Sequence, residues 1–242
     1  MKTGQARSYL AIVALLAFGA LFAAFGTWQL RRAETSRATR AQFDSGVAGA
    51  ALAALPGSLD DAERFRRVAV RGAYVERPQF LLDNMLHDGT AGYHVLTALR
   101  VAGERERMLM LVNRGWVPAG GDRRVLPGVD VGGGTRTVSG RLERLPQPGL
   151  RLGANGAGGP AGDVVVLQYP TAAELAERLG EPVYDYQILL DAAASDGYVR
   201  EWRAPGVAPE RHLAYAGQWL ALAVGAAGAA LVMAYRIAMR RP

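Results

Sequence analysis

The chain carries a long apolar segment near each end. Residues 10–30 and 213–235 contain no charged side chain. At about 1.5 Å of rise per residue, a helix of either length crosses a hydrocarbon core of about 30 Å. The stretch between them holds no third segment of this kind. The sequence therefore predicts two transmembrane helices that flank one domain of ordinary size.

Composition and motifs exclude several functional classes. The net charge is +6, but the arginines are interleaved with acidic residues and accompany no basic helix, so we expect no nucleic-acid partner. The chain has no cysteine, which excludes disulfide scaffolds and thiolate metal sites. It also lacks the common hydrolase, zincin, P-loop and dinucleotide motifs. We therefore predict a protein that is not an enzyme, with no catalytic residue and no metal site formed by side chains alone.

The first apolar segment has two interpretations. It resembles a cleaved signal peptide, because Lys2 and Arg7 precede an apolar run that ends in a small-residue pattern at 24–26. However, the run is longer than usual for such a peptide, and it continues into Trp28 and the pair Arg31-Arg32. An aromatic residue followed by basic residues is typical of the boundary of a retained anchor, which we favour.

The central section alternates apolar and polar residues in the manner of strands. Short runs separated by glycine-containing turns favour a β-rich, mainly antiparallel domain. One surface helix is expected after Thr171, because Thr171 and Glu174 form a capping box and Gly180 is placed for a C-terminal cap. The strands are expected at 68–75, 79–83, 92–101, 107–117, 135–145, 163–168 and 184–191.

These observations give an α+β membrane protein. The first helix is expected to continue beyond residue 30 for a few turns, until Pro56 breaks it, and the Gly/Pro-rich segment 146–162 is expected to be a flexible loop. The expected parts are a tail at 1–9, a span at 10–30, the domain at 31–212, a span at 213–235 and a tail at 236–242.

His212 is the strongest candidate for a functional residue, because ionisable groups at a membrane boundary are costly. On a helix, Tyr215 and Trp219 share its face, and a planar apolar ligand such as haem could lie there with the imidazole on its iron. The alternative is an interfacial anchor, since His, Tyr and Trp are common at headgroup level. His94, in a predicted strand, is expected to be a surface histidine.

Small residues recur every four positions along the second span, at Gly217, Ala221, Gly225 and Ala229. A similar series occurs at 19, 23 and 27 in the first span. Such stripes allow close helix packing. We therefore expect the two spans to pack through these stripes, which would leave the His212 face open to a ligand or partner.

Several blocks together resemble the Surfeit locus protein one (Surf-one) family, and they cover nearly the whole chain in order. The blocks are GTWQLRR at 26–32, RVAVRGAY at 67–74, LLDN at 81–84, GYHVLT at 92–97, VNRGWVP at 112–118 and PERHLAYAGQW at 209–219. Small departures occur at Ala98, where the family often has Pro, and at Leu220, where it often has Phe.

The resemblance implies an assembly factor for cytochrome c oxidase that binds haem a and aids its insertion into subunit I. The family's haem-linked histidine corresponds to His212, with Tyr215 and Trp219 beside it, and Arg114 could pair with a haem propionate. Expected partners are oxidase subunit I, proteins of haem a synthesis and assembly, and membrane lipid. The expected location is the bacterial plasma membrane, with both termini cytoplasmic and the domain periplasmic. The alternative is a haem-free scaffold that stabilises nascent subunit I.

Overall fold

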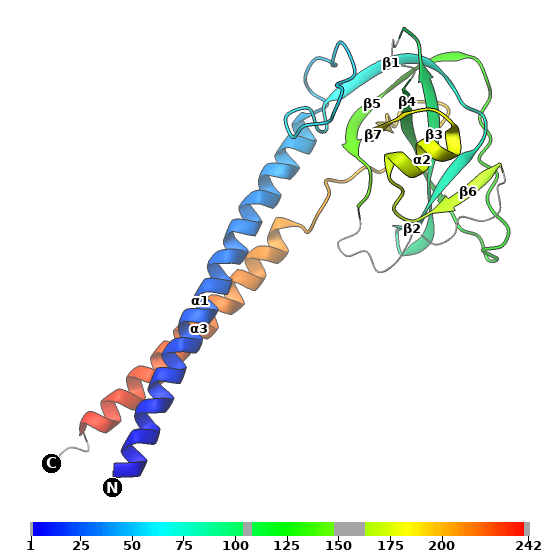
Figure 1. The fold of residues 1–242 in the computed structure, drawn as a ribbon. Helices are drawn as coiled ribbons and strands as arrows, with labels where there is room; N and C mark the ends of the chain where they lie inside the picture. Colours follow the sequence, from blue (N-terminus) through cyan, green and yellow to red (C-terminus); the bar gives the residue numbers. More distant parts are fainter. Residues whose placement is uncertain (1, 104–107, 148–162, 240–242) are drawn as a thin grey trace. The chain divides into compact units, whose positions relative to one another are not determined.

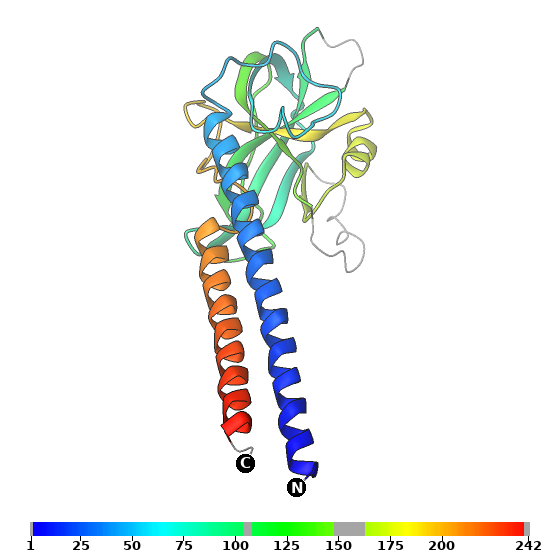
Figure 2. The ribbon, with the colours of Figure 1, turned by 90° about the vertical axis from the view of Figure 1, so that its left-hand side faces the viewer.

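The computed structural model describes residues 2–103, 108–147 and 163–239. The chain forms two compact units, one from Met1–Ala41 with Ala204–Pro242 and one from Gln42–Arg203. The first unit contains most of α1 (Lys2–Ser45) and all of α3 (Pro209–Met239), which run side by side and antiparallel (Figures 1 and 2). Both helices are long and apolar enough to cross a membrane, as the two apolar segments predict.

The second unit is built on seven strands, as the alternation predicts. They are β1 (Arg67–Tyr74), β2 (Gln79–His87), β3 (Thr90–Val101), β4 (Leu109–Pro118), β5 (Thr135–Arg144), β6 (Val164–Leu167) and β7 (Val183–Leu190). Their order is β1-β5-β7-β4-β3-β2-β6, and β1 also pairs with the end of β3. This last pairing closes five strands into a barrel, while β2 and β6 extend the sheet beyond β3 (Figure 1). Only β4–β7 and β2–β6 are parallel, so the mainly antiparallel character is confirmed.

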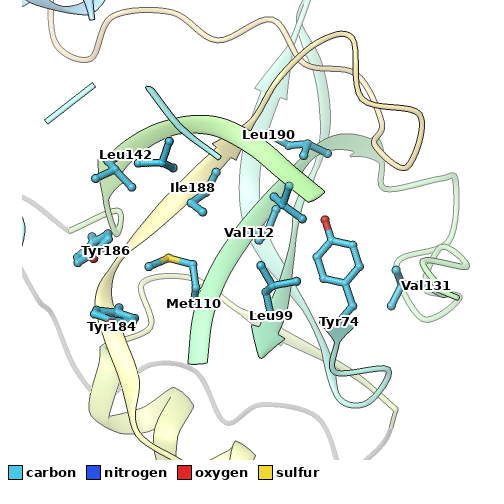
Figure 3. Packing of buried hydrophobic residues seen from close by; sticks show 12 residues of the cluster. Tyr74, Leu99, Met110, Val112, Val131, Leu142, Tyr184, Tyr186, Ile188 and Leu190 are labelled. Carbon is cyan, nitrogen blue, oxygen red and sulfur yellow. The ribbon is translucent and has the colours of Figure 1, made fainter. Parts of the chain in front are cut away.

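Alternate side chains of the barrel strands fill its interior. Figure 3 shows this cluster, in which Met110 and Val112 of β4 meet Ile188 of β7 and Leu99 of β3. Residues two apart on a strand share a face, so the intervening positions of β3 and β4, such as Leu96 and Leu111, point outward. There they form a second cluster beneath α2 (Ala172–Leu179), which supplies the buried Leu175. The helix has the predicted capping box at Thr171 and a left-handed Gly180 at its end.

The predicted extension of the first helix beyond residue 30 is confirmed, because α1 continues for about four more turns. It ends at Ser45, before Pro56, where the break was expected. Phe43 in its last turn is buried with its ring edge-on to Phe65 at 5.2 Å. Gly46 follows directly, and a Cβ there would lie only 2.3 Å from the carbonyl oxygen of Phe65. Packing of the turn against Phe65 therefore ends the helix at the first glycine after residue 26. From residue 148 onward, the expected loop 146–162 lies outside the described residues.

Candidate functional site

The two helices pack through small residues spaced seven apart. On α1, Gly19, Gly26 and Ala33 are buried. On α3, Ala216 and Ala230 are buried, with Ala223 half-buried midway between them. A Cβ on Gly19 would lie 3.6 Å from the carbonyl oxygen of Ala223, and one on Gly26 would lie 3.6 Å from that of Ala216. We call these residues the helix seam.

The predicted packing stripe on α3 is therefore wrong. Gly217, Ala221, Gly225 and Ala229 are exposed, and nothing lies within 4 Å of a Cβ built on Gly217 or Gly225. The reason is geometric, because seven residues return to nearly the same face, with a drift of about 20°, whereas four residues drift by about twice as much. At about 100° per residue, Gly217 already points away from the face of Ala216, and the drift carries the later members of the stripe toward the opposite side of the helix. The seven-residue series stays on the contact face.

His212 lies on the seam face of α3 and is half-buried. Its Nδ1 is 2.7 Å from Oε1 of Gln29, which comes from α1. An amide oxygen only accepts hydrogen bonds, so this contact is a hydrogen bond in the tautomer that carries the ring proton on Nδ1. In that tautomer the lone pair is on Nε2. This is the atom that remains able to ligate a metal ion.

The aromatic residues predicted beside His212 are arranged in two different ways. Trp219 is half-buried in the seam, with its ring 5.7 Å from that of Phe22 and 5.1 Å from that of Phe25. Tyr215 lies outside the seam and is 51% exposed. The expectation of a fully open His212 face is therefore wrong, because α1 covers the part of it that bears Trp219.

Basic side chains flank the His212–Gln29 pair in sequence on both helices. Arg31 and Arg32 follow Gln29, Arg211 precedes His212, and all three are exposed. On the other side of the pair, within the apolar segments, most exposed side chains are apolar, among them Leu222 and Phe25. The site thus offers one half-buried imidazole between an apolar surface and a cationic one, which suits an amphipathic ligand that carries carboxylates.

Arg114 belongs to the other compact unit, and the residue is only 5% exposed. Its nitrogens donate to three backbone carbonyls, those of Asp196 at 2.9 Å, Val129 at 3.1 Å and Asp130 at 3.5 Å. The guanidinium also lies over the ring of Tyr198 at 5.0 Å. This geometry favours a structural role for Arg114, which fastens two loops to β4, and lends no support to a propionate contact.

His94 is half-buried, so its expected position at the surface is wrong. Asn113 Nδ2 lies 3.3 Å from its Nδ1, and the ring of Trp202 stands edge-on at 5.5 Å. Burial lowers the pKa of His94 to about 4, so the ring is neutral at physiological pH. Strand alternation placed His94 on the outer face, but it carried no information that Trp202, far away in sequence, covers that face.

Gln29 was missed as a site residue. The available signal was a polar side chain within an otherwise apolar segment, next to an aromatic-basic boundary. Within residues 2–103, 108–147 and 163–239, no group of three or more His, Asp or Glu side chains could hold a metal ion. Any metal ligation by these residues would thus rest on fewer than three such side chains.

The chain matches the sequence model of the SURF1 family over residues 16–224, which covers nearly its whole length. It belongs to the SURF1 family. This is a family of cytochrome oxidase assembly factors, and the matched range contains the β domain and every residue of the helix seam except Ala230. A comparison with curated proteins gives no match. The resemblance of the six sequence blocks is thereby confirmed.

Proposed function

We propose that this SURF1-family protein binds haem a through His212 and passes it to subunit I during assembly of cytochrome c oxidase. The observation that carries the proposal is the contact of His212 Nδ1 with Gln29, because it leaves the Nε2 lone pair for iron. Haem a, as cargo, would supply an iron atom with a vacant axial position and two carboxylates.

The residues present fit such a cargo. A single imidazole gives one axial bond, which exchanges more readily than two and so suits a carrier that must release its cargo. Tyr215 offers an exposed aromatic surface beside it. The exposed guanidinium of Arg211 is one candidate partner for a propionate, since Arg binds carboxylates in two-point contacts. Haem a is poorly soluble in water, and a site at the membrane boundary avoids its exposure.

The proposal includes an orientation of the chain in the membrane. Both termini lie in the cytoplasm of a bacterial cell and the β domain lies in the periplasm, so that His212 is near the outer surface of the plasma membrane. Long loops cross membranes largely regardless of their charge, and therefore the arginines between the spans do not oppose this orientation. Subunit I and the proteins that synthesise haem a would be the partners within the membrane.

A haem-free scaffold for subunit I is the second candidate, and one observation favours it. The stripe Gly217, Ala221, Gly225 and Ala229 is not used in the seam and is exposed, so a helix of another protein could approach it closely. On this alternative, His212→Ala is nearly silent, whereas Gly225→Leu weakens association with subunit I.

The test is the visible spectrum of the detergent-purified full chain after co-expression with the enzymes of haem a synthesis. The wild type is expected to carry haem a, and His212→Ala is expected to lose it. His87→Ala is the matched control, since His87 is in β2 of the other unit. A colourless wild type purified from membranes that contain haem a would exclude the proposal and favour the scaffold, to be examined by crosslinking to subunit I.

A further inference from the structure

We infer that Gln29 is the positioning residue of His212, and that it sets which imidazole nitrogen is available to a metal ion. This inference rests on the proposed function of His212 as an iron ligand. Gln29 does not touch the iron in this scheme. It acts by accepting a hydrogen bond from the N–H at Nδ1 of His212, which lies 2.7 Å away on the opposite helix.

The physical basis is that the two nitrogens of a neutral imidazole share one proton. Whichever nitrogen donates a hydrogen bond leaves the other as the base. Imidazoles that bind metals commonly donate their second N–H to a carbonyl, carboxylate or water, which fixes both tautomer and ring orientation. The Gln29 carboxamide oxygen supplies such an acceptor within a half-buried position.

The choice of a neutral amide has a consequence for release of the cargo. A carboxylate at this position would draw the Nδ1 proton more strongly and make Nε2 a more basic, tighter ligand. An amide orients the ring with less increase in basicity. Gln29 therefore combines a defined ligand geometry with a moderate bond to iron, as a protein that hands its cargo onward requires.

The contact also depends on correct pairing of the helices. Gln29 lies three residues after Gly26 and four before Ala33, which are both buried in the seam. Small residues at these two positions let the helices approach closely. Because Gln29 and His212 come from opposite ends of the chain, the ligand tautomer is fixed only when α1 and α3 are paired.

The first test uses the full chain without haem. The chain has three histidines, so ¹⁵N-histidine spectra in detergent can be assigned with His212→Ala. The expected signal of His212 has a protonated Nδ1 and an unprotonated Nε2. Gln29→Leu is expected to shift the proton toward Nε2, while Gln218→Leu, the same change at an exposed position of α3, leaves it in place. A wild type with the proton on Nε2, or a Gln29→Leu spectrum identical to it, would overturn the inference.

The second test measures haem a affinity and midpoint potential in the loaded protein. Gln29→Leu is expected to weaken binding by about 10- to 100-fold, the usual effect of losing such a partner, and to raise the potential. Gln29→Glu is expected to lower the potential, because a more basic imidazole favours the ferric state. If Gln29 acted only in helix packing, both variants would shift the midpoint potential in the same direction. That result would overturn the inference.

The two tests separate the inference from the proposed function. If the wild type binds no haem a, the proposed function is wrong. The NMR spectrum of His212 in the haem-free protein still tests whether Gln29 sets the tautomer. A wild type that binds haem a through His212, with unchanged spectra in both Gln29 variants, removes only the role of Gln29.

Discussion

Gly19 of α1 and Ala226 of α3 face each other across the helix pair, and a Cβ built on Gly19 would lie 3.6 Å from that of Ala226. This separation lies within the range that disulfides span, about 3.5–4.5 Å between Cβ atoms. The chain has no cysteine of its own. An engineered cysteine pair therefore reports on this one contact without interference.

We expect Gly19→Cys with Ala226→Cys to form an intramolecular disulfide in membranes under mild oxidation. Protection from thiol labelling, restored by reduction and read by mass spectrometry, measures the yield. The control is Gly19→Cys with Gly225→Cys, because Gly225 adjoins Ala226 but has nothing within 4 Å of its Cβ position. Equal yields in the two pairs would mean that the seam is not the contact surface of the helices.

Gly26→Leu is expected to weaken the pairing of the helices. A Cβ at Gly26 would lie 2.8 Å from Cγ and Cδ2 of Leu220 and 3.6 Å from the backbone oxygen of Ala216. A leucine at this position would therefore displace Leu220 and press against the backbone of α3. Overpacking of this kind typically costs about 1–3 kcal/mol. Thermal unfolding in detergent and the yield of the engineered disulfide both measure the loss. Gly217→Leu makes the same change in open space and should leave both quantities unchanged.

The burial of His94 predicts a loss of stability in acid. Its pKa is lowered from 6.5 to about 4 in the folded chain, so the unfolded chain binds the proton more readily. The contribution to stability is complete above pH 6.5 and is lost as the pH falls toward 4, by at most about 3 kcal/mol. Urea unfolding at several pH values measures this slope.

His94→Gln is the variant that tests the origin of the slope. Its amide can still accept a hydrogen bond from Asn113, but it does not ionise, so the acid slope between pH 6.5 and 4 should become shallower. The same substitution at His87 is the matched control for the β domain. If His94→Gln retains the full wild-type slope, groups other than His94 cause it.

Arg114→Met is expected to destabilise the β domain by about 3 kcal/mol or more. The substitution removes the donor from the buried carbonyl of Val129 and from the part-buried carbonyl of Asp196, and each such loss costs about 1–3 kcal/mol. Arg114→Lys should recover only part of this, because an ammonium group lacks the planar fork of donors. Arg124→Met, at a side chain that is 91% exposed, is the neutral control.

The same Arg114 variants distinguish the structural role from the propionate contact suggested by the family resemblance. With a structural role alone, Arg114→Met protein that remains folded keeps the wild-type haem a spectrum and affinity. A folded Arg114→Met variant with normal stability that has lost haem a would instead support the propionate contact. Stability and haem affinity should therefore be measured on the same preparation.

Most elements could be predicted from local patterns. The seven strands follow from alternation or from short apolar runs, and α2 follows from the residues that cap it, because these signals act within a few residues. The closure of the barrel could not be predicted from local patterns, since the pairing of β1 with β3 and of β5 with β7 joins segments far apart in sequence. Nor could the end of α1 at Ser45, which depends on packing against Phe65.

The candidate site, too, could be predicted only in part from the sequence. The sequence by itself determined the two membrane helices and the placement of an imidazole at the start of the second, because length, hydropathy and position suffice for both. Only the tertiary structure decided that the seven-residue seam, and not the four-residue stripe, pairs the helices. It also brought Gln29 to His212, because a hydrogen bond between the two ends of a chain exists only after the chain has folded.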